Sequence, residues 1–366
     1  MDGNGQRASP PESLAIVGLA TRFPGEASTT EDFWNFLVQR KCAHTPFPVD
    51  RIGPGHYHPD PEHGGSHAVQ GAHLLAEDPA YFDAPFFGIT KGEATAMDPQ
   101  QRLVLENVYH ALENAGYSLE DISGTDASVY VSGFNHDYLS IQNSDPEMAS
   151  RFKATGMTNS MLSNRLSWFL NAHGPSMTID TACSSSMVAL HLGCQSLLLK
   201  ESNVAIVSGV TVISYPGDIT NMSHQGFLGS AGRCFSFDSR AAGYARGEGV
   251  GSVVVKRLED AVECGDTIRA VIRGTAVNQD GKTPGLTLPD SAAQESLIRN
   301  VYASAQLPLT DTAMVEAHGT GTAVGDPIEA NALARAFSSR SKDQPLMVGA
   351  VKSGTGHLEG AAGVAG

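Results

Sequence analysis

The chain has 366 residues, of which 41% are hydrophobic and 17% charged, and it contains 39 glycines. This composition indicates one large or two modest globular domains and excludes a disordered chain, a coiled coil and a collagen. The formal net charge of −15 argues against general nucleic-acid binding, because no basic excess is available to replace phosphate counterions.

The cysteines are odd in number, widely spaced and without a CxxC pair, which indicates neither a disulfide framework nor a zinc site. They are Cys42, Cys183, Cys194, Cys234 and Cys264. No apolar N-terminal signal and no apolar stretch of about 18 residues is present. The sequence therefore predicts a cytoplasmic protein that does not span a membrane.

The first 82 residues combine short predicted elements with stretches that show no clear periodicity. Residues 1–12 are polar and rich in Pro and Gly and are expected to form a flexible leader, followed by a strand at 14–18 and a helix at 31–39. Residues 42–82 show no clear period and are expected to run over the surface. Four histidines there are interpreted as a solvated surface cluster: His56, His58, His63 and His67.

A helix is predicted between Asp98 and Gly116. Asp98 is the N-cap candidate, Pro99 occupies the favoured first position, and Gln101 stands where the partner of a capping box would be. An apolar stripe runs along this segment, and Gly116 can end the helix.

Strands and helices then alternate to the end of the chain. Strands are expected at 128–132, 176–179, 204–210, 250–258, 268–277, 313–316 and 346–351, and helices at 160–170, 184–199, 290–305 and from 326. The two strands at 250–258 and 268–277 are expected to adjoin. Alternation of this kind predicts an α/β fold with largely parallel sheets, and its restart near residue 268 suggests two related halves.

Cys183 is the first candidate for chemistry. It follows the strand at 176–179 in Asp180-Thr-Ala-Cys183-Ser-Ser-Ser186 and precedes a helix. A thiol at a helix start lies near unpaired N–H groups and the positive end of the helix dipole, which favour the thiolate. The three serines can satisfy first-turn N–H groups. The alternative is a small buried hydrophobic side chain, the commoner role of a lone cysteine.

Two histidines stand in similar positions. His318 follows the strand at 313–316 in His318-Gly-Thr320-Gly-Thr322, where two hydroxyls would suit an amide-bearing substrate arm. Asp326 and Pro327 look like the N-cap and first residue of the next helix. His357 follows a glycine-rich turn after Lys352, and a histidine at a helix N-terminus tends to stay neutral and can donate a hydrogen bond to an oxyanion.

These three side chains follow strand ends, and parallel α/β sheets gather such ends on one face, so Cys183, His318 and His357 are expected to converge. One cysteine and two histidines without a carboxylate partner are unusual for a hydrolase. The set suits acyl transfer to sulfur and carbon–carbon bond formation, with both rings holding a thioester oxygen as it becomes an enolate.

From about residue 14 to its end, the sequence resembles the β-ketoacyl synthases, specifically ketosynthase domains of iterative type I polyketide synthases, and most of all fungal highly reducing synthases. Further motifs that carry the resemblance are Phe86-Phe-Gly88, Met97-Asp-Pro-Gln-Gln-Arg-Leu103, Leu162-Ser-Asn-Arg-Leu-Ser167, Gly174-Pro-Ser-Met-Thr-Ile-Asp-Thr-Ala-Cys183, Arg246-Gly-Glu-Gly249 and Asn278-Gln-Asp-Gly281.

The resemblance implies a thiolase-like fold with five αβαβα layers in two pseudo-duplicated halves, here residues 13–260 and an incomplete half at 261–366, acting as a homodimer. It implies decarboxylative Claisen condensation of a malonyl unit, with no cofactor bound directly and with phosphopantetheine on a partner acyl carrier protein. Cys183 resembles the nucleophile, His318 and His357 the decarboxylating pair, Lys352 the lysine that organises the second histidine, and Thr320 and Thr322 positions that contact pantetheine.

Members of this family continue past the helix of the second histidine, whereas this sequence stops at residue 366 inside an expected helix. The chain is therefore expected to be C-terminally truncated and, by itself, poorly active or unstable. A weak or dead relative acting as a dimerising or binding module is the main alternative. A degradative thiolase is disfavoured because no cysteine follows Cys264, and a papain-type protease because its cysteine context is missing.

Overall fold

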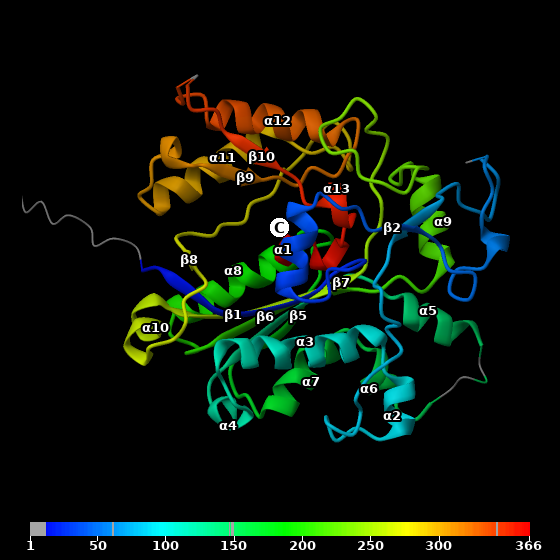
Figure 1. Ribbon diagram of the computed structural model, residues 1–366, viewed down its shortest axis with the longest axis horizontal. Coiled ribbons are helices and arrows are strands. Elements are labelled where there is room, and N and C mark those ends of the chain that lie inside the picture. The colour runs from blue at the N-terminus through cyan, green and yellow to red at the C-terminus, as the bar shows by residue number, and fades with distance from the viewer. Residues whose placement is uncertain (1–11, 61, 146, 148–149, 342) are drawn as a thin grey trace, which may run out of the picture.

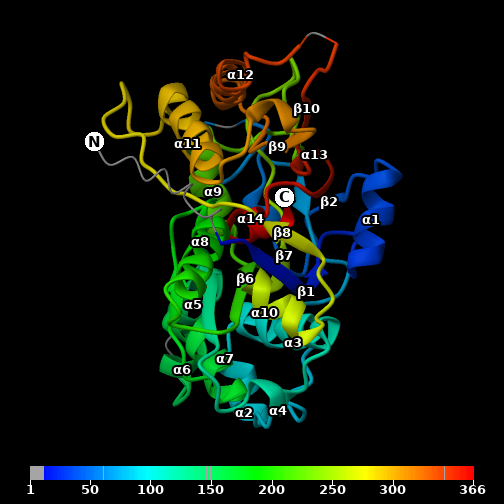
Figure 2. The same cartoon turned by 90° about the vertical axis from the view of Figure 1, so that its left-hand side faces the viewer.

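Five layers stack in the order helices, sheet, helices, sheet, helices (Figure 1). The structure is a computed structural model that describes residues 12–60, 62–145, 147, 150–341 and 343–366. The leader expected at residues 1–12 lies outside this description, apart from residue 12. Seen from the side in Figure 2, the second sheet and its outer helices lie beyond α8, away from α3 and α7. This is the five-layer architecture that the sequence predicted.

The six-stranded sheet has the order β5-β4-β6-β7-β1-β8. Its strands are β1 (Leu14–Arg22), β4 (Ser128–Gly133), β5 (Ser176–Ile179), β6 (Ala205–Thr211), β7 (Gly249–Arg257) and β8 (Ala270–Ile272). β4 pairs in parallel with β5 and β6, whereas β7 is antiparallel to both β6 and β1, and β8 is antiparallel to β1.

Two predictions about this sheet are wrong. It is mixed rather than largely parallel, and β7 and β8 do not adjoin because β1 lies between them. β1 comes from the start of the chain, more than 200 residues away in sequence. A pairing between such distant segments leaves no trace in local periodicity.

The second sheet consists, within the described residues, of the parallel pair β9 (Met314–Glu316) and β10 (Met347–Gly349). α11 (Ser291–Ser304) and α12 (Gly325–Ala336) cover it through a cluster that includes Leu333 and Phe337. A short antiparallel pair, β2 (His44–Pro46) and β3 (Gly71–His73), lies beside the main sheet.

The other helices flank these sheets. They are α1 (Thr30–Val38), α2 (Lys91–Ala96), α3 (Pro99–Ala115), α4 (Leu119–Ile122), α5 (Asp137–Ser144), α6 (Lys153–Met157), α7 (Ser160–Leu170), α8 (Ser185–Leu198), α9 (Pro216–His224), α10 (Leu258–Cys264), α13 (Lys352–Thr355) and α14 (Ala362–Ala365). Among the helices of the described ranges, none is both long and apolar enough to cross a membrane.

α3 begins and ends as its sequence predicts. The Asp98 carboxylate accepts from the backbone N–H of Gln100, and Gly116 adopts φ 82° after the last turn. The apolar stripe is buried in the main core, where each large side chain stabilises the fold by about 1.5–3 kcal/mol. The prediction of a capping box is wrong. The side-chain NH2 of Gln101 donates to the carbonyl of Gly156, and the side-chain oxygen of Gln101 accepts from Arg165.

The segment at 42–82 is not a plain surface excursion. Ile52, Val69 and Leu74 belong to a buried cluster, and the strands β2 and β3 are too short to give a readable period. His67 is also buried, against Phe47. The prediction that His67 belongs to a solvated surface cluster of histidines is therefore wrong. Burial lowers the pKa of His67.

Gly18 provides a test of how closely β1 packs on α3. A Cβ at this position would lie 2.4 Å from the carbonyl oxygen of Ala111 and 2.6 Å from the Cβ of Ala115. Gly18→Ala is therefore expected to lower the free energy of unfolding by about 1–3 kcal/mol in urea denaturation. Gly53→Ala is the matched control, since a Cβ there meets nothing within 4 Å. Equal midpoints for both variants would show that α3 moves to accept the methyl group.

Candidate active site

Cys183, His318 and His357 meet in one place, although they lie far apart in the sequence. One ligand-type atom from each side chain (sulfur or ring nitrogen) lies within 4.8 Å of the other two. The two imidazole rings stand nearly perpendicular, with centroids 5.3 Å apart. Cys183 follows β5 and His318 follows β9, as expected, whereas His357 follows the short helix α13 rather than a strand. The expected convergence is confirmed.

A tight elbow holds Cys183 in front of α8. Ala182 adopts φ 55°, a left-handed conformation that non-glycine residues rarely take. The Ser185 hydroxyl accepts from the backbone N–H of Thr181 at 2.8 Å and donates to the carbonyl of Ala182. The Ser184 hydroxyl donates to the carbonyl of Thr181 and lies 2.9 Å from the Thr181 hydroxyl. The prediction that the serines satisfy first-turn N–H groups is wrong, since Ser184 and Ser185 stabilise the elbow and Ser186 accepts from the backbone N–H of Gly363.

Burial raises the pKa of the Cys183 thiol. The charge of Lys352 acts in the opposite direction but is the smaller effect. The expectation of a thiolate favoured by the helix start is therefore wrong for the free protein. Desolvation of the sulfur outweighs both the backbone hydrogen bond at Cys183 and the charge of Lys352.

The ring of His357 is buried and its tautomer is defined by one hydrogen bond. The backbone N–H of Glu359 donates to Nδ1 at 3.1 Å. Since Nδ1 accepts, the proton of the neutral ring resides on Nε2, which is left as a donor. Desolvation lowers the pKa of His357 well below its usual value, and the charges of His318, Lys352 and Arg246 lower it further.

Burial is the main cause of the neutrality of His357, and the positive charges around the ring add to it. The contribution that the sequence suggested from a helix dipole remains a prediction.

His318 is held through its main chain. Its backbone N–H and that of Gly319 donate to the two carboxylate oxygens of Glu329, at 2.6 and 2.8 Å. The side chain is open to solvent on one side. Desolvation by the surrounding protein and the charge of Lys352 lower the pKa of His318 to about 4. Both imidazoles are thus neutral at physiological pH.

Lys352 lies behind the histidines with its side chain buried. Burial lowers the pKa of its ammonium group, and the carboxylates of Glu316 and Glu329 act against this effect. These two carboxylates accept backbone N–H groups of Val351 and His318. Lys352 therefore supplies positive charge to a site that contains no carboxylate of its own.

The two threonines lie next to His318 in the chain. Their hydroxyl oxygens are 3.4 Å apart, and that of Thr322 also accepts the backbone N–H of Gly325 at the start of α12. Asp326 does not cap this helix as expected. Its carboxylate accepts from the backbone N–H groups of Phe237, Gly321 and Thr322 and holds the threonine loop in place.

Arg246 stands in one of the motifs that carry the family resemblance, but sequence reasoning assigned no role to it or to Glu359. They form a buried ion pair whose Nε and Oε1 atoms are 2.8 Å apart. A charged residue of each sign within glycine-rich, apolar surroundings was the signal that could have found them.

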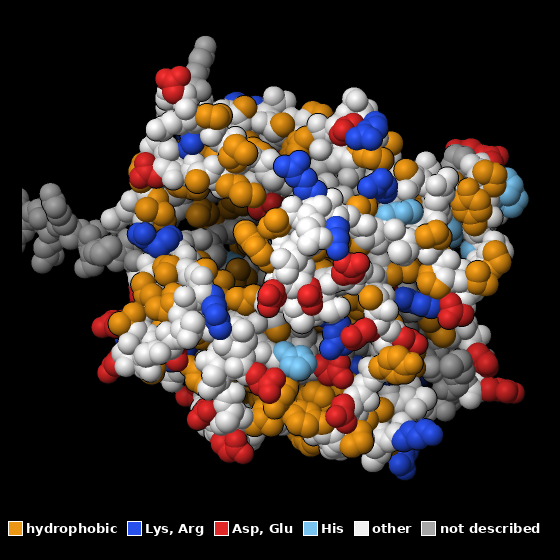
Figure 3. Space-filling view, viewed as in Figure 1, with side chains coloured by type: hydrophobic (Ala, Val, Ile, Leu, Met, Phe, Trp, Pro, Cys, Tyr) orange, Lys and Arg blue, Asp and Glu red, His pale blue; other side chains and the backbone are white. Residues whose placement is uncertain are grey.

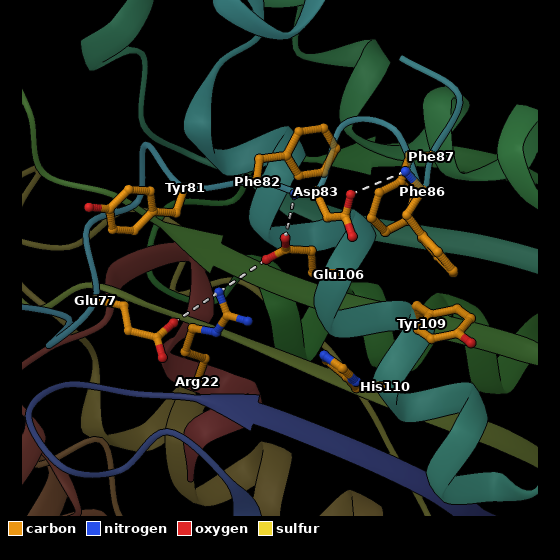
Figure 4. Close-up of a pocket in the computed structure, with 10 residues that line it drawn as sticks. All are labelled: Arg22, Glu77, Tyr81, Phe82, Asp83, Phe86, Phe87, Glu106, Tyr109 and His110. Atoms are coloured by element: carbon orange, nitrogen blue, oxygen red, sulfur yellow. Dashed lines mark hydrogen bonds and ion pairs between the residues drawn. The ribbon is translucent and has the colours of Figure 1, made fainter. Parts of the chain in front are cut away.

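A cavity of about 570 Å³ lies away from these residues, against α3. It is lined by aromatic side chains around the Arg22–Glu106 ion pair (Figure 4). A second hollow, visible in Figure 3 between the main sheet and the upper block of helices, opens on the face shown there.

Zinc binding is the other chemistry that a Cys-His-His set allows. The nearby charge of Lys352 argues against it, because a buried ammonium group would repel a divalent cation. The prediction that the site holds no metal remains a prediction.

Two protein-family models match this chain. The N-terminal domain of β-ketoacyl synthases matches residues 11–261, and the C-terminal domain matches residues 269–366. The chain belongs to the β-ketoacyl synthase family.

The curated relatives of this ketosynthase domain include fungal polyketide synthases. It is 48% identical to the 6-hydroxymellein synthase cdmE of Talaromyces verruculosus and 50% identical to the highly reducing polyketide synthase Preu1 of Preussia isomera, in each case over 97% of the chain. The chain spans only 14% and 15% of the lengths of these curated relatives. The resemblance to ketosynthase domains of highly reducing polyketide synthases is confirmed.

Solved structures confirm the thiolase-like ketosynthase fold. The oxazolomycin ketosynthase domain OzmH KS7 of Streptomyces albus superposes with a TM-score of 0.91 at 37% identity, covering 97% of this chain and 61% of that one. The ketosynthase from module 6 of the bacillaene synthase of Bacillus subtilis gives 0.88 at 36% identity, covering 97% and 60%.

The charge of Lys352 can be tested through the reactivity of Cys183. Lys352→Met is expected to raise the pKa of the thiol and to slow its alkylation by iodoacetamide at pH 8–9, by about tenfold for each unit of the rise. In both proteins the rate should climb with pH, since only the thiolate reacts. Alkylation of the exposed Cys264 is the internal reference, and Lys91→Met, at an exposed lysine, is the matched control. An unchanged rate would show that the charge does not reach the sulfur.

Proposed function

We propose that this domain is a β-ketoacyl synthase of the 3-oxoacyl-[acyl-carrier-protein] synthase type, which condenses a malonyl thioester with an acyl group held on Cys183. The main support is the meeting of Cys183 with two neutral histidines, one of which offers Nε2–H as a donor. The halves at residues 13–260 and 261–366 would supply the nucleophile and the histidine pair respectively.

In the first step, the Cys183 thiolate attacks the carbonyl carbon of an acyl thioester. The carbon–sulfur bond to the incoming pantetheine thiol breaks, that thiol takes up a proton, and the acyl group is left on Cys183. The raised pKa of Cys183 means that the thiolate is a minor form, and the charge of Lys352 increases its population.

In the second step, a malonyl thioester lies beside the acylated cysteine and loses carbon dioxide. The electron pair of the breaking carbon–carbon bond moves to the thioester oxygen, giving an enolate. His318 and His357, both neutral, donate hydrogen bonds to that oxygen as charge develops. Neutral rings suit this task because they can hold the enolate without protonating its carbon.

In the last step, the enolate carbon attacks the carbonyl of the acyl-Cys183 thioester. A carbon–carbon bond forms, the carbon–sulfur bond to Cys183 breaks, and the β-ketoacyl product leaves on its carrier. Lys352 stabilises the thiolate that is released, and burial together with the same charge keeps both histidines unprotonated for another cycle.

The substrates of this chemistry are acyl and malonyl thioesters on the phosphopantetheine of an acyl carrier protein. Thr320 and Thr322 lie next to His318, and their hydroxyls can bind the amides of the pantetheine arm. No cofactor is bound directly in this scheme. The domain is further proposed to act as a cytoplasmic homodimer that binds neither nucleic acid nor membrane.

Acylation of Cys183 tests the proposal. Incubation with a butyryl-pantetheine thioester is expected to add one acyl group to the chain, detected by intact mass, and Cys183→Ala is expected to abolish the adduct. Cys264→Ala, at an exposed cysteine, should keep it. Absence of an adduct from folded wild-type protein would instead favour the role of a binding module.

His357→Ala is expected to separate the two halves of the reaction. The acyl adduct on Cys183 should still form, whereas carbon dioxide release from malonyl-pantetheine should fall by about 10²–10³, the usual effect of losing one oxyanion donor. His110→Ala, at an exposed histidine of α3, should leave both unchanged. A parallel loss of both steps would contradict the assignment of His357 to decarboxylation.

A further inference from the structure

Arg246 and Glu359 form a bidentate salt bridge next to His357, and within the described residues the remaining guanidinium nitrogen, Nη1, is buried without a hydrogen-bond partner. The guanidinium donates twice, from Nε to Oε1 at 2.8 Å and from Nη2 to Oε2 at 2.9 Å, and only 2% of each side chain is exposed. A bidentate fork of this kind fixes the relative orientation of both partners. The pair also joins two segments that are 113 residues apart in the sequence.

The main chains around both partners contact His357. The backbone N–H of His357 donates to the carbonyl of Ala245 at 2.7 Å, and the backbone N–H of Gly247 donates to the carbonyl of His357 at 2.8 Å. On the other side, the backbone N–H of Glu359 donates to ring Nδ1. The salt bridge therefore ties together the two segments that hold the histidine.

Glu359 needs this tie because its own backbone is strained. It adopts φ 46°, in the left-handed region that favours glycine. Its neighbours Leu358 and Ala361 are buried in a separate hydrophobic cluster. The fork to Arg246 thus stabilises the conformation in which the Glu359 N–H meets Nδ1.

We propose that Arg246 and Glu359 are positioning residues that hold the His357 ring in the Nε2–H tautomer and in a single orientation for decarboxylation. Among the described residues neither side chain hydrogen-bonds to Cys183 or His318, and both are expected to act mainly through His357. The inference rests on the proposed function for its kinetic consequence, whereas the tautomer is a property of the protein alone.

Two variants test the proposal. Removing one charge would leave the other buried and unpaired, which destabilises proteins strongly, so the first variant removes both charges with apolar side chains of similar length, Arg246→Met with Glu359→Met. The second, Arg246→Lys, keeps the positive charge but cannot form the fork. The matched control is Lys256→Met with Asp266→Leu, a mostly buried pair on β7 and the loop after α10.

Three measurements are made on each variant of the 366-residue chain. They are acylation of Cys183 by intact mass, carbon dioxide release from malonyl-pantetheine, and the ¹⁵N chemical shifts of labelled histidine. The shifts of His357 are assigned by comparison with His357→Gln. Both variants should keep acylation within about twofold and lose decarboxylation by about ten- to a hundredfold, the effect of small misplacements in active sites. The two ring nitrogens of His357 should change from the well-separated ¹⁵N shifts of a single tautomer to the averaged shifts of two exchanging tautomers. The control should resemble the wild type in all three.

Equal losses of acylation and decarboxylation, or an unchanged Nε2–H tautomer in Arg246→Lys, would overturn the proposal. If the double variant does not fold, Arg246→Lys decides the question, since it keeps the buried charge balanced. If the wild-type chain neither acylates nor decarboxylates, the proposed function fails, and the ¹⁵N shifts still decide whether the salt bridge sets the tautomer.

Discussion

Two main-chain hydrogen bonds between His357 and the segment before β7 determine where the chemistry of this protein takes place. They pair His357 with Arg246 as in a short parallel bridge, and His73 extends the bridge on the other side by donating its N–H to the carbonyl of Arg246. The space is so tight that a Cβ at Gly356 would lie 2.6 Å from the His73 ring. This close packing holds the segment that carries His357 against its neighbours, and a ring nitrogen of His357 lies within 4.8 Å of the Cys183 sulfur.

The electrostatics of the site depend on the carboxylates around it, which are bound to groups other than the two imidazole rings. Glu316 and Glu329 lie close to Lys352 but use their oxygens on backbone N–H groups, and Glu359 is occupied by Arg246. Within the described residues no carboxylate is hydrogen-bonded to either imidazole, and burial together with the charge of Lys352 keeps both rings neutral. The charge of Lys352 partly offsets the desolvation of the Cys183 thiolate, and two neutral rings can donate to an enolate, whereas a histidine paired with a carboxylate would favour proton transfer.

Local sequence signals predicted individual elements well wherever the deciding contacts were also local. α7 and β5 have the expected bounds, and the ends of α3 follow from Asp98, Pro99 and Gly116. The errors concern side chains whose partners lie far away. Gln101 forms no capping box and bonds to Gly156 and Arg165 instead. Asp326 does not cap its helix and accepts from backbone N–H groups such as that of Gly321 instead. A polar side chain near a helix start has several possible partners, and only packing selects among them.

The sequence by itself determined the family, the five-layer α/β architecture and the set of Cys183, His318 and His357, because motif order and alternation of strands and helices are properties of the chain. Only the tertiary structure decided that β1 separates β7 from β8, that burial raises the pKa of Cys183, and that Arg246 and Glu359 lie behind His357. Desolvation and long-range pairing depend on which distant residues exclude water around a group, and no local pattern of residues encodes that neighbourhood.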